Sequence, residues 1–184
     1  MRKIYLFTLL SILTFPCILQ AQSKKYSGQW LLNSSGKYTE KGYGFSLGGE
    51  KYLSNSYSSL RGEFVFLRNK NNFNITDLAC HVNTYFFNLT YFYSLEAMDT
   101  KPFIFNLGIG FFAGTEKLTG TFPYGIKKRQ GNHFLFGFHF SPQIEVPFCK
   151  NLSAYLEPSI GLRKSIQDKF FFSLGLGIKY YLPF

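Results

Sequence analysis

The last stretch of the chain, Lys169 to Phe184, reads K-F-F-F-S-L-G-L-G-I-K-Y-Y-L-P-F. Every even position from Phe170 to Leu182 is apolar or aromatic. The odd positions between them include small and polar residues, namely Ser173, Gly175, Gly177 and Lys179. Side chains that alternate with a period of two belong to a β-strand, because successive side chains point to opposite faces. The stretch therefore predicts a strand with one continuous lipophilic face.

The same alternation recurs through the chain and predicts eight strands, at about residues 28–34, 43–50, 60–67, 79–95, 103–114, 133–145, 152–163 and 170–182. Gly, Pro, Ser and Asn mark the connections. The pattern predicts turns at 36–42, 53–57, 96–102 and 147–151, and longer loops at 69–78 and 117–130. In the fourth strand the alternation is imperfect, which predicts a β-bulge near Val82 to Thr84. Eight is an even number, as bacterial membrane barrels require.

Alternation alone fits both a soluble barrel with an apolar interior and a membrane barrel with an apolar exterior. The polar face carries charges of both signs but few lysines: Glu50, Arg61, Glu63, Glu145, Glu157, Arg163 and Lys179. A soluble surface usually carries more charge, whereas the narrow lumen of an eight-stranded barrel must pair the charges it contains. Aromatic residues make up 20% of the chain and charged residues only 16%. We therefore expect an all-β, eight-stranded, antiparallel up-and-down outer-membrane β-barrel with a structural charge network in its lumen.

The first 21 residues read as a secretory signal peptide. Arg2 and Lys3 precede an apolar run from Ile4 to Leu19, and Ala21 supplies a small residue for cleavage. Pro16 interrupts the run, which is shorter than the roughly 20 residues that a membrane-spanning helix needs. We expect residues 22–184 to form a single barrel domain that is exported to the outer membrane.

Charge and strand number bear on nucleic-acid binding. Without Arg2 and Lys3 the chain has 18 basic and 10 acidic residues, a net charge of +8. The aromatic residues alternate along strands instead of lining a basic groove, so direct contact with DNA is not expected. Eight strands leave an interior just wide enough for their own side chains, which excludes a DNA-conducting pore in one chain. The run Lys127-Lys128-Arg129 either keeps its loop solvated or contacts lipopolysaccharide, DNA or a partner protein.

The sequence offers no legible catalytic, cofactor-binding or metal site. His133 and His139 share a face but lie six residues apart, about 20 Å along a strand, too far to bind one metal ion. There is no phosphate-binding loop, no G-x-G-x-x-G and no C-x-x-C. The four lumen carboxylates could include a general acid and base, but buried charges need partners, and this favours a network of ion pairs. The pattern indicates a non-enzymatic protein without a cofactor or small-molecule substrate.

Two cysteines follow the signal segment, Cys80 and Cys149. An even count in an exported protein favours a disulfide. The predicted topology instead places Cys80 at the outer end of the barrel and Cys149 in a periplasmic turn, on either side of an apolar band about 25 Å tall. A disulfide requires Cα atoms within about 7 Å of each other. Both cysteines are therefore predicted to be free thiols.

The order of motifs along the chain resembles the conjugal transfer protein TraO family of Bacteroidetes conjugative transposons. The resemblance lies in the segments 42–48, 62–63, 103–116, 136–137 and 171–179, together with Glu145 and Arg163. It implies an outer-membrane component of a type IV secretion-like apparatus for DNA transfer, whose partners are membrane lipid and other proteins of that apparatus. It implies no catalytic residues. The alternatives are a stand-alone outer-membrane barrel for adhesion, envelope integrity or small-ligand binding, and a lumenal enzyme.

Overall fold

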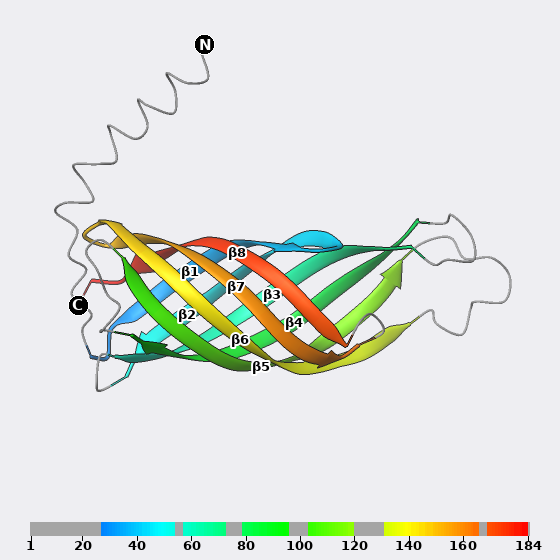
Figure 1. Cartoon of the computed structure of the whole chain (residues 1–184), viewed down its shortest axis with the longest axis horizontal. Coiled ribbons are helices and arrows are strands. Elements are labelled where there is room, and N and C mark those ends of the chain that lie inside the picture. The colour runs from blue at the N-terminus through cyan, green and yellow to red at the C-terminus, as the bar shows by residue number, and fades with distance from the viewer. Residues whose placement is uncertain are drawn as a thin grey trace, which may run out of the picture.

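The structure, a computed structural model, describes residues 27–53, 57–72, 79–95, 103–119, 131–165 and 169–183. The predicted signal peptide, 1–21, lies outside these residues. Eight strands form the described fold (Figure 1): β1 (Trp30–Thr39), β2 (Gly42–Tyr52), β3 (Ser58–Asn72), β4 (Ala79–Ser94), β5 (Ile104–Thr119), β6 (Asn132–Cys149), β7 (Leu152–Lys164) and β8 (Phe170–Tyr181). In this part of the chain no helix is long and apolar enough to cross a membrane.

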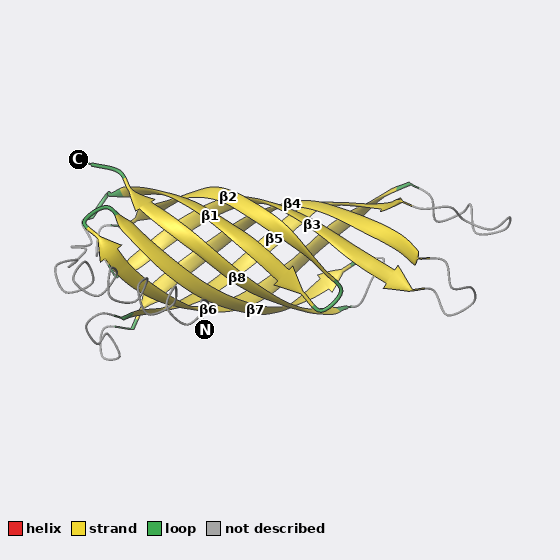
Figure 2. Ribbon diagram, turned by 90° about the horizontal axis from the view of Figure 1, so that it is seen from above, coloured by secondary structure: helices red, strands yellow, loops and turns green. Residues whose placement is uncertain are grey.

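The strands close into a barrel. Each pairs antiparallel with the next along the chain, and β1 also pairs with β8, where Leu31 lies opposite Tyr181. Because the number of strands is even, β1 begins and β8 ends at the same end of the barrel. Figure 2 shows the strands tilted across one another around this closed wall. The predicted eight-stranded antiparallel up-and-down barrel is confirmed.

The two faces of the wall differ as the closing strand predicts. Along β8 the even positions are exposed, with Leu176 66% exposed, whereas Ser173, Gly175, Gly177 and Lys179 are buried in the interior. β6 has the same pattern, and its Phe138 is 67% exposed. Large apolar side chains from all eight strands are exposed in this way. A continuous apolar exterior of this extent requires an apolar surrounding, because monomeric soluble proteins rarely expose such patches.

Several predicted boundaries are wrong, and the largest errors are strands that continue into predicted turns and loops. The turn expected at 36–42 is in fact strand: β1 continues to Thr39, β2 begins at Gly42, and only Glu40 and Lys41 form the turn. Polar side chains here suggested a turn, but Lys37 and Thr39 point into the lumen and are buried. A polar residue is therefore no turn signal where the strand interior is itself polar.

Two loops and one turn farther along are also shorter than expected. β3 extends to Asn72, into the predicted loop 69–78, and β5 extends to Thr119, into the predicted loop 117–130. β6 ends only at Cys149, which reduces the turn predicted at 147–151 to two residues. The turns predicted at 53–57 and 96–102 do connect successive strands, although 54–56 and 96–102 lie outside the described residues. Six of the described strands, β3 to β8 with 12 to 18 residues, exceed the roughly 9 to 11 residues that a tilted membrane strand needs, and the excess allows polar residues at their ends.

The bulge predicted near Val82 to Thr84 is absent. β4 keeps an unbroken register with β3 and β5 through these residues. The alternation looked imperfect because apolar residues of this strand, Val82 and Phe92 among them, face inward and are buried. The described register shifts at a different place, between Pro147 and Cys149 where β6 pairs with β7.

Candidate functional site: an ion-pair network in the barrel lumen

Arg61 of β3 is the centre of a charged cluster inside the barrel. Its Nε lies 3.0 Å from Glu50 Oε2, and its Nη1 lies 2.6 Å from Glu157 Oε2 and 3.6 Å from Glu63 Oε1. Its side chain is 0% exposed. Glu50 and Glu63 come from β2 and β3, but Glu157 comes from β7, so these contacts cross the lumen. Arg61 thus links opposite walls of the barrel.

Aromatic rings enclose the same guanidinium group. Its Cζ lies 4.2 Å from the centroid of the Phe92 ring and 5.2 Å from that of Tyr155. Phe92 reaches the lumen because Gly108 on the neighbouring strand has no side chain: a Cβ there would lie 2.6 Å from the Phe92 ring. A cation against a ring face is attracted by the ring quadrupole, more strongly where water is excluded. The glycine therefore helps to hold the arginine in place.

Lys179 of β8 extends the cluster toward the end of the barrel where the chain begins. Its Nζ lies 2.8 Å from Glu145 Oε2 and 3.2 Å from Glu50 Oε2. Ser153 donates a hydrogen bond of 2.6 Å to Glu145, and the hydroxyl of Tyr181 donates another. The carboxylate of Glu145 is thus held by one cation and two hydroxyl groups, the full set of contacts that a buried charge needs.

Lys37 of β1 completes the cluster from the other side. Its Nζ lies 3.1 Å from Glu157 Oε1 and 3.9 Å from Glu63 Oε2. Lys37 is not among the predicted network residues because it lies in the predicted turn 36–42. The alternation of side chains along the strand could have predicted it, because the odd positions of β1 from Leu31 to Thr39 all face inward.

The network joins three cations, Lys37, Arg61 and Lys179, to four carboxylates, Glu50, Glu63, Glu145 and Glu157. Six of its seven members were predicted from the polar face of the strands. All seven side chains are at most 7% exposed. Mutual attraction offsets the desolvation of such charges only where they are paired and hydrogen-bonded. Each of the seven has an oppositely charged partner within 3.9 Å, so the cluster meets this condition.

Arg163, the seventh residue predicted for the network, lies nearer the opposite end. Its guanidinium stands 5.5 Å from the centroid of the Phe171 ring, and it belongs to none of the ion pairs described above. In this part of the lumen Glu116 is fully buried, and the Ser165 hydroxyl donates one hydrogen bond shared between its two carboxylate oxygens, at 2.8 and 2.7 Å. Glu116 is at an even position of β5, on the same face as Gly108 and Gly110. The alternation that places these two glycines inside could therefore have predicted that Glu116 faces the lumen.

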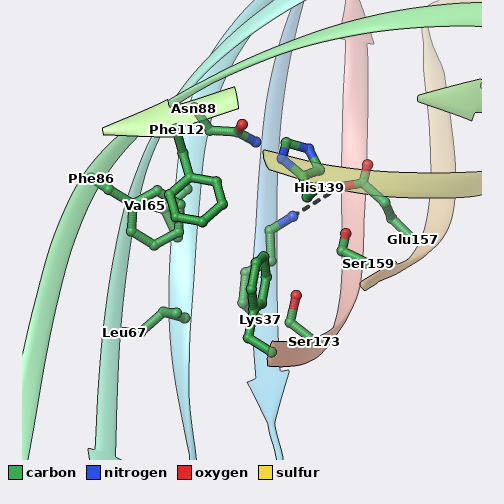
Figure 3. Close-up of a pocket in the computed structure, with 11 residues that line it drawn as sticks. Lys37, Val65, Leu67, Phe86, Asn88, Phe112, His139, Glu157, Ser159 and Ser173 are labelled. Atoms are coloured by element: carbon green, nitrogen blue, oxygen red, sulfur yellow. Dashed lines mark hydrogen bonds and ion pairs between the residues drawn. The ribbon is translucent and has the colours of Figure 1, made fainter. Parts of the chain in front are cut away.

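A small cavity lies beside the ion pair of Lys37 and Glu157 (Figure 3). It measures about 30 Å³, far smaller than the pockets of about 300 to 1,000 Å³ that bind small molecules. Lys37 and Glu157 bound it on one side, and the rings of Phe112 and His139 face it. The lumen is thus filled by side chains, as the strand number predicts, and leaves no passage for a nucleic acid.

The described residues show no arrangement suited to catalysis or metal binding. The four carboxylates of the network are each engaged with a cation. His139 lies 3.1 Å from the hydroxyl of Thr90. No group of three or more metal-ligating side chains occurs in the described segments. The run Lys127-Lys128-Arg129, predicted to solvate its loop or contact a partner, lies outside them.

Known structures share this architecture. A major outer-membrane protein from Thermus thermophilus matches with a TM-score of 0.62 at 9% identity, over 85% of this chain and 100% of that one. The fold is that of an outer-membrane β-barrel. The N-terminal barrel domain of Pseudomonas aeruginosa OprF matches with a TM-score of 0.54 at 14% identity, over 85% and 98% of the two chains. Ail, the attachment invasion locus protein of Yersinia pestis, matches with 0.51 at 12% identity, over 85% and 100%.

At sequence identities of 9 to 14%, these matches show a shared fold and nothing about function. No protein-family model matches the sequence, and no curated protein does. The function must therefore be argued from the residues themselves.

Proposed function

We propose that the protein is a non-enzymatic outer-membrane component of a conjugative DNA-transfer apparatus, in which the barrel anchors other proteins and does not conduct DNA. The family resemblance supports the conjugative role. The observation that supports an anchoring role is the lumen, which the network centred on Arg61 fills from wall to wall.

The residues that carry the resemblance are also those that shape the interior. Glu63, Glu145 and Lys179 belong to the ion-pair network. Gly108 admits the Phe92 ring, and Gly137 admits that of Phe112, to which a Cβ at position 137 would come within 2.6 Å. The segments of the resemblance therefore include residues that fill the lumen.

The experiment is deletion of the gene from a donor strain that carries the transfer element. We expect the transfer frequency to fall at least tenfold, with growth unchanged, and to recover when the wild-type gene is restored. Complementation with Lys127→Ala, Lys128→Ala and Arg129→Ala combined tests whether this run contacts the apparatus. That variant should fold normally, because the network lies in the barrel and not in the loop. An unchanged transfer frequency after deletion of the gene would contradict the conjugative role.

A second candidate is a barrel that acts alone at the cell surface. The observation in its favour is that this chain matches Ail, named as an attachment invasion locus protein, over 100% of that chain. Deletion would then leave transfer unchanged and reduce attachment of the cells to surfaces.

A lumenal enzyme is the third candidate from the sequence. The ion pairs of the four network carboxylates argue against it, because a general acid or base must be available to a substrate. Assays of lipid acyl transfer and ester hydrolysis with the folded barrel should show no activity above that of the Glu157→Gln variant.

A further inference from the structure

The charges on the outside of the barrel are distributed unevenly. Of the six carboxylates in the described residues, five lie in the lumen, and only Glu40 is exposed. Six exposed basic residues lie toward the end of the barrel far from the termini: Lys41, Arg68, Lys70, Lys117, Lys164 and Lys169. At the other end the described exposed basic residues are Lys51 and Lys150. The exterior is thus markedly more basic at one end.

The basic end faces the cell exterior. Outer-membrane barrels have short periplasmic turns and longer extracellular loops. The longest connection in the chain, between Thr119 of β5 and Asn132 of β6, is at the end far from the termini, whereas Lys150 and Asn151 alone connect β6 to β7 at the other.

The six basic residues form a collar at one height. With a tilt of about 40° and a rise of about 3.3 Å, each residue advances about 2.5 Å along the barrel axis, and each step to a register partner on the next strand changes the height by about 3 Å. On this basis the six Cα atoms lie within about 6 Å of one another in height and about 6 to 12 Å beyond Tyr38. This spread matches the headgroup layer, which is several ångströms thick on each side of the hydrocarbon core.

Part of the collar borders a groove of about 660 Å³ on the outer side of β1 to β4. Its lining residues are Tyr38, Glu40, Lys41, Gly42, Tyr43, Arg68, Lys70 and His81. Tyr43 pairs with Arg68, and Lys70 pairs with His81, so these side chains are cross-strand neighbours. The amide of Lys70 donates a hydrogen bond of 2.7 Å to the carbonyl oxygen of Lys41. Three cations and one carboxylate give the groove an excess of two positive charges.

We propose that this groove, with the collar around it, binds the phosphate groups of lipopolysaccharide in the outer leaflet. Arg68 offers a planar fork of donors that matches a phosphate, and Lys41 and Lys70 add point charges. Tyr38 and Tyr43 are 66% and 65% exposed at the edge of the apolar band, where tyrosine prefers to lie between lipid and water. The headgroup would rest against these rings with its phosphates toward the cations.

The direction in which the side chains point favours a lipid over a soluble polyanion. Tyr43 and Arg68 project outward from the barrel wall, on the same face as Phe45 and Phe64, which belong to the apolar band. A polyanion that approached from outside the cell would meet the mouth of the barrel first. A lipid in the membrane plane instead lies directly against the outward face that carries Tyr43 and Arg68.

The test measures binding of lipid A to the purified, folded barrel in zwitterionic detergent, with fluorescent lipid A followed by anisotropy. A basic residue near an anionic surface contributes a factor of about five in affinity. Arg68→Gln with Lys70→Gln should therefore weaken binding about 30-fold. The matched control, Lys51→Gln with Lys150→Gln, removes the same charge at the periplasmic end and should change affinity less than twofold. Lys70→Arg keeps the charge and should stay within threefold.

A gel-shift on heating verifies that each variant is folded, and the exposure of all these side chains makes loss of folding unexpected. Enzymatically dephosphorylated lipid A should bind at least tenfold more weakly than the phosphorylated form. Equal binding of the two forms, or equal binding of the Arg68 and Lys70 double variant and the wild type, would overturn the proposal. So would an affinity for heparin or DNA that exceeds the affinity for lipid A and depends on the same two residues.

Discussion

Replacement of Arg61 by methionine tests the lumen network at its centre. Methionine approximates the aliphatic part of the side chain and removes the guanidinium group. The cluster then holds two cations and four carboxylates, so its net charge changes from −1 to −2. Removal of one partner from a buried ion pair costs about 3 to 5 kcal/mol.

The contacts that remain place the expected loss at the lower end of this range. Glu50 keeps Lys179 at 3.2 Å, and Glu157 keeps Lys37 at 3.1 Å. We therefore expect Arg61→Met to lower the free energy of unfolding by about 3 kcal/mol, which is roughly a 150-fold change in the folding equilibrium. Adding Glu157→Gln restores the net charge to −1 and should recover about 1 to 2 kcal/mol, because residues in direct contact are not additive.

Urea unfolding of the barrel in lipid vesicles measures both values. Trp30 is the one tryptophan of the chain and is 54% exposed on the outer face, so its fluorescence reports release from lipid. Lys117→Met, which removes an exposed charge, is the control and should change stability by less than about 0.5 kcal/mol. A loss below about 1 kcal/mol for Arg61→Met, or an additive double variant, would refute the reasoning and indicate that water solvates the lumen charges.

Three further outcomes are expected. Leu176→Arg places a charge in the middle of the apolar band and should lower stability by about 2 to 4 kcal/mol in vesicles, whereas Asn132→Arg, beyond the band, should be neutral; equal losses would mean that the faces are assigned wrongly. Gly137→Val should lower stability by about 1 to 3 kcal/mol, since its Cβ would meet a carbonyl oxygen of β7, and an unchanged urea midpoint would contradict this contact. Alkylation after unfolding without reductant should label both Cys80 and Cys149, while an intramolecular disulfide between them, found by mass spectrometry, would overturn the topology.

The closing strand could be predicted from the sequence because a period of two survives wherever one face meets lipid and the other a polar lumen. Glu50 and Arg61 could be assigned to the interior on the same ground. The alternation along a strand predicts which face of the barrel wall a side chain lies on, but not which residue it contacts. The contact between Arg61 and Glu157 joins residues 96 positions apart across the lumen, and it depends on the tilt and register of the closed barrel.

The strand ends were harder to predict for a physical reason. Near the ends of long strands the outer face leaves the lipid, so Lys70 and Lys117 are compatible with strand and with loop. Inward aromatic residues such as Phe92 and Phe112 are equally misleading, since they fill the lumen beside glycines and make the alternation look irregular. The collar of exposed basic residues was not predicted for the same reason: Lys41, Lys70 and Lys117 were assigned to a turn and two loops.

Spin labels on β8 test the central claim, that the apolar face lies in lipid and the polar face in a packed lumen. Single cysteines at positions 172 to 178, in a protein with Cys80→Ser and Cys149→Ser, carry the label in vesicles. Labels at the even positions Phe172, Leu174, Leu176 and Ile178 should collide with oxygen dissolved in the lipid and not with a water-soluble nickel complex. Labels at Ser173, Gly175 and Gly177 should collide with neither. If the odd positions collide with the nickel complex while the even ones are shielded from both, the chain is a soluble barrel with an apolar interior and the account is wrong.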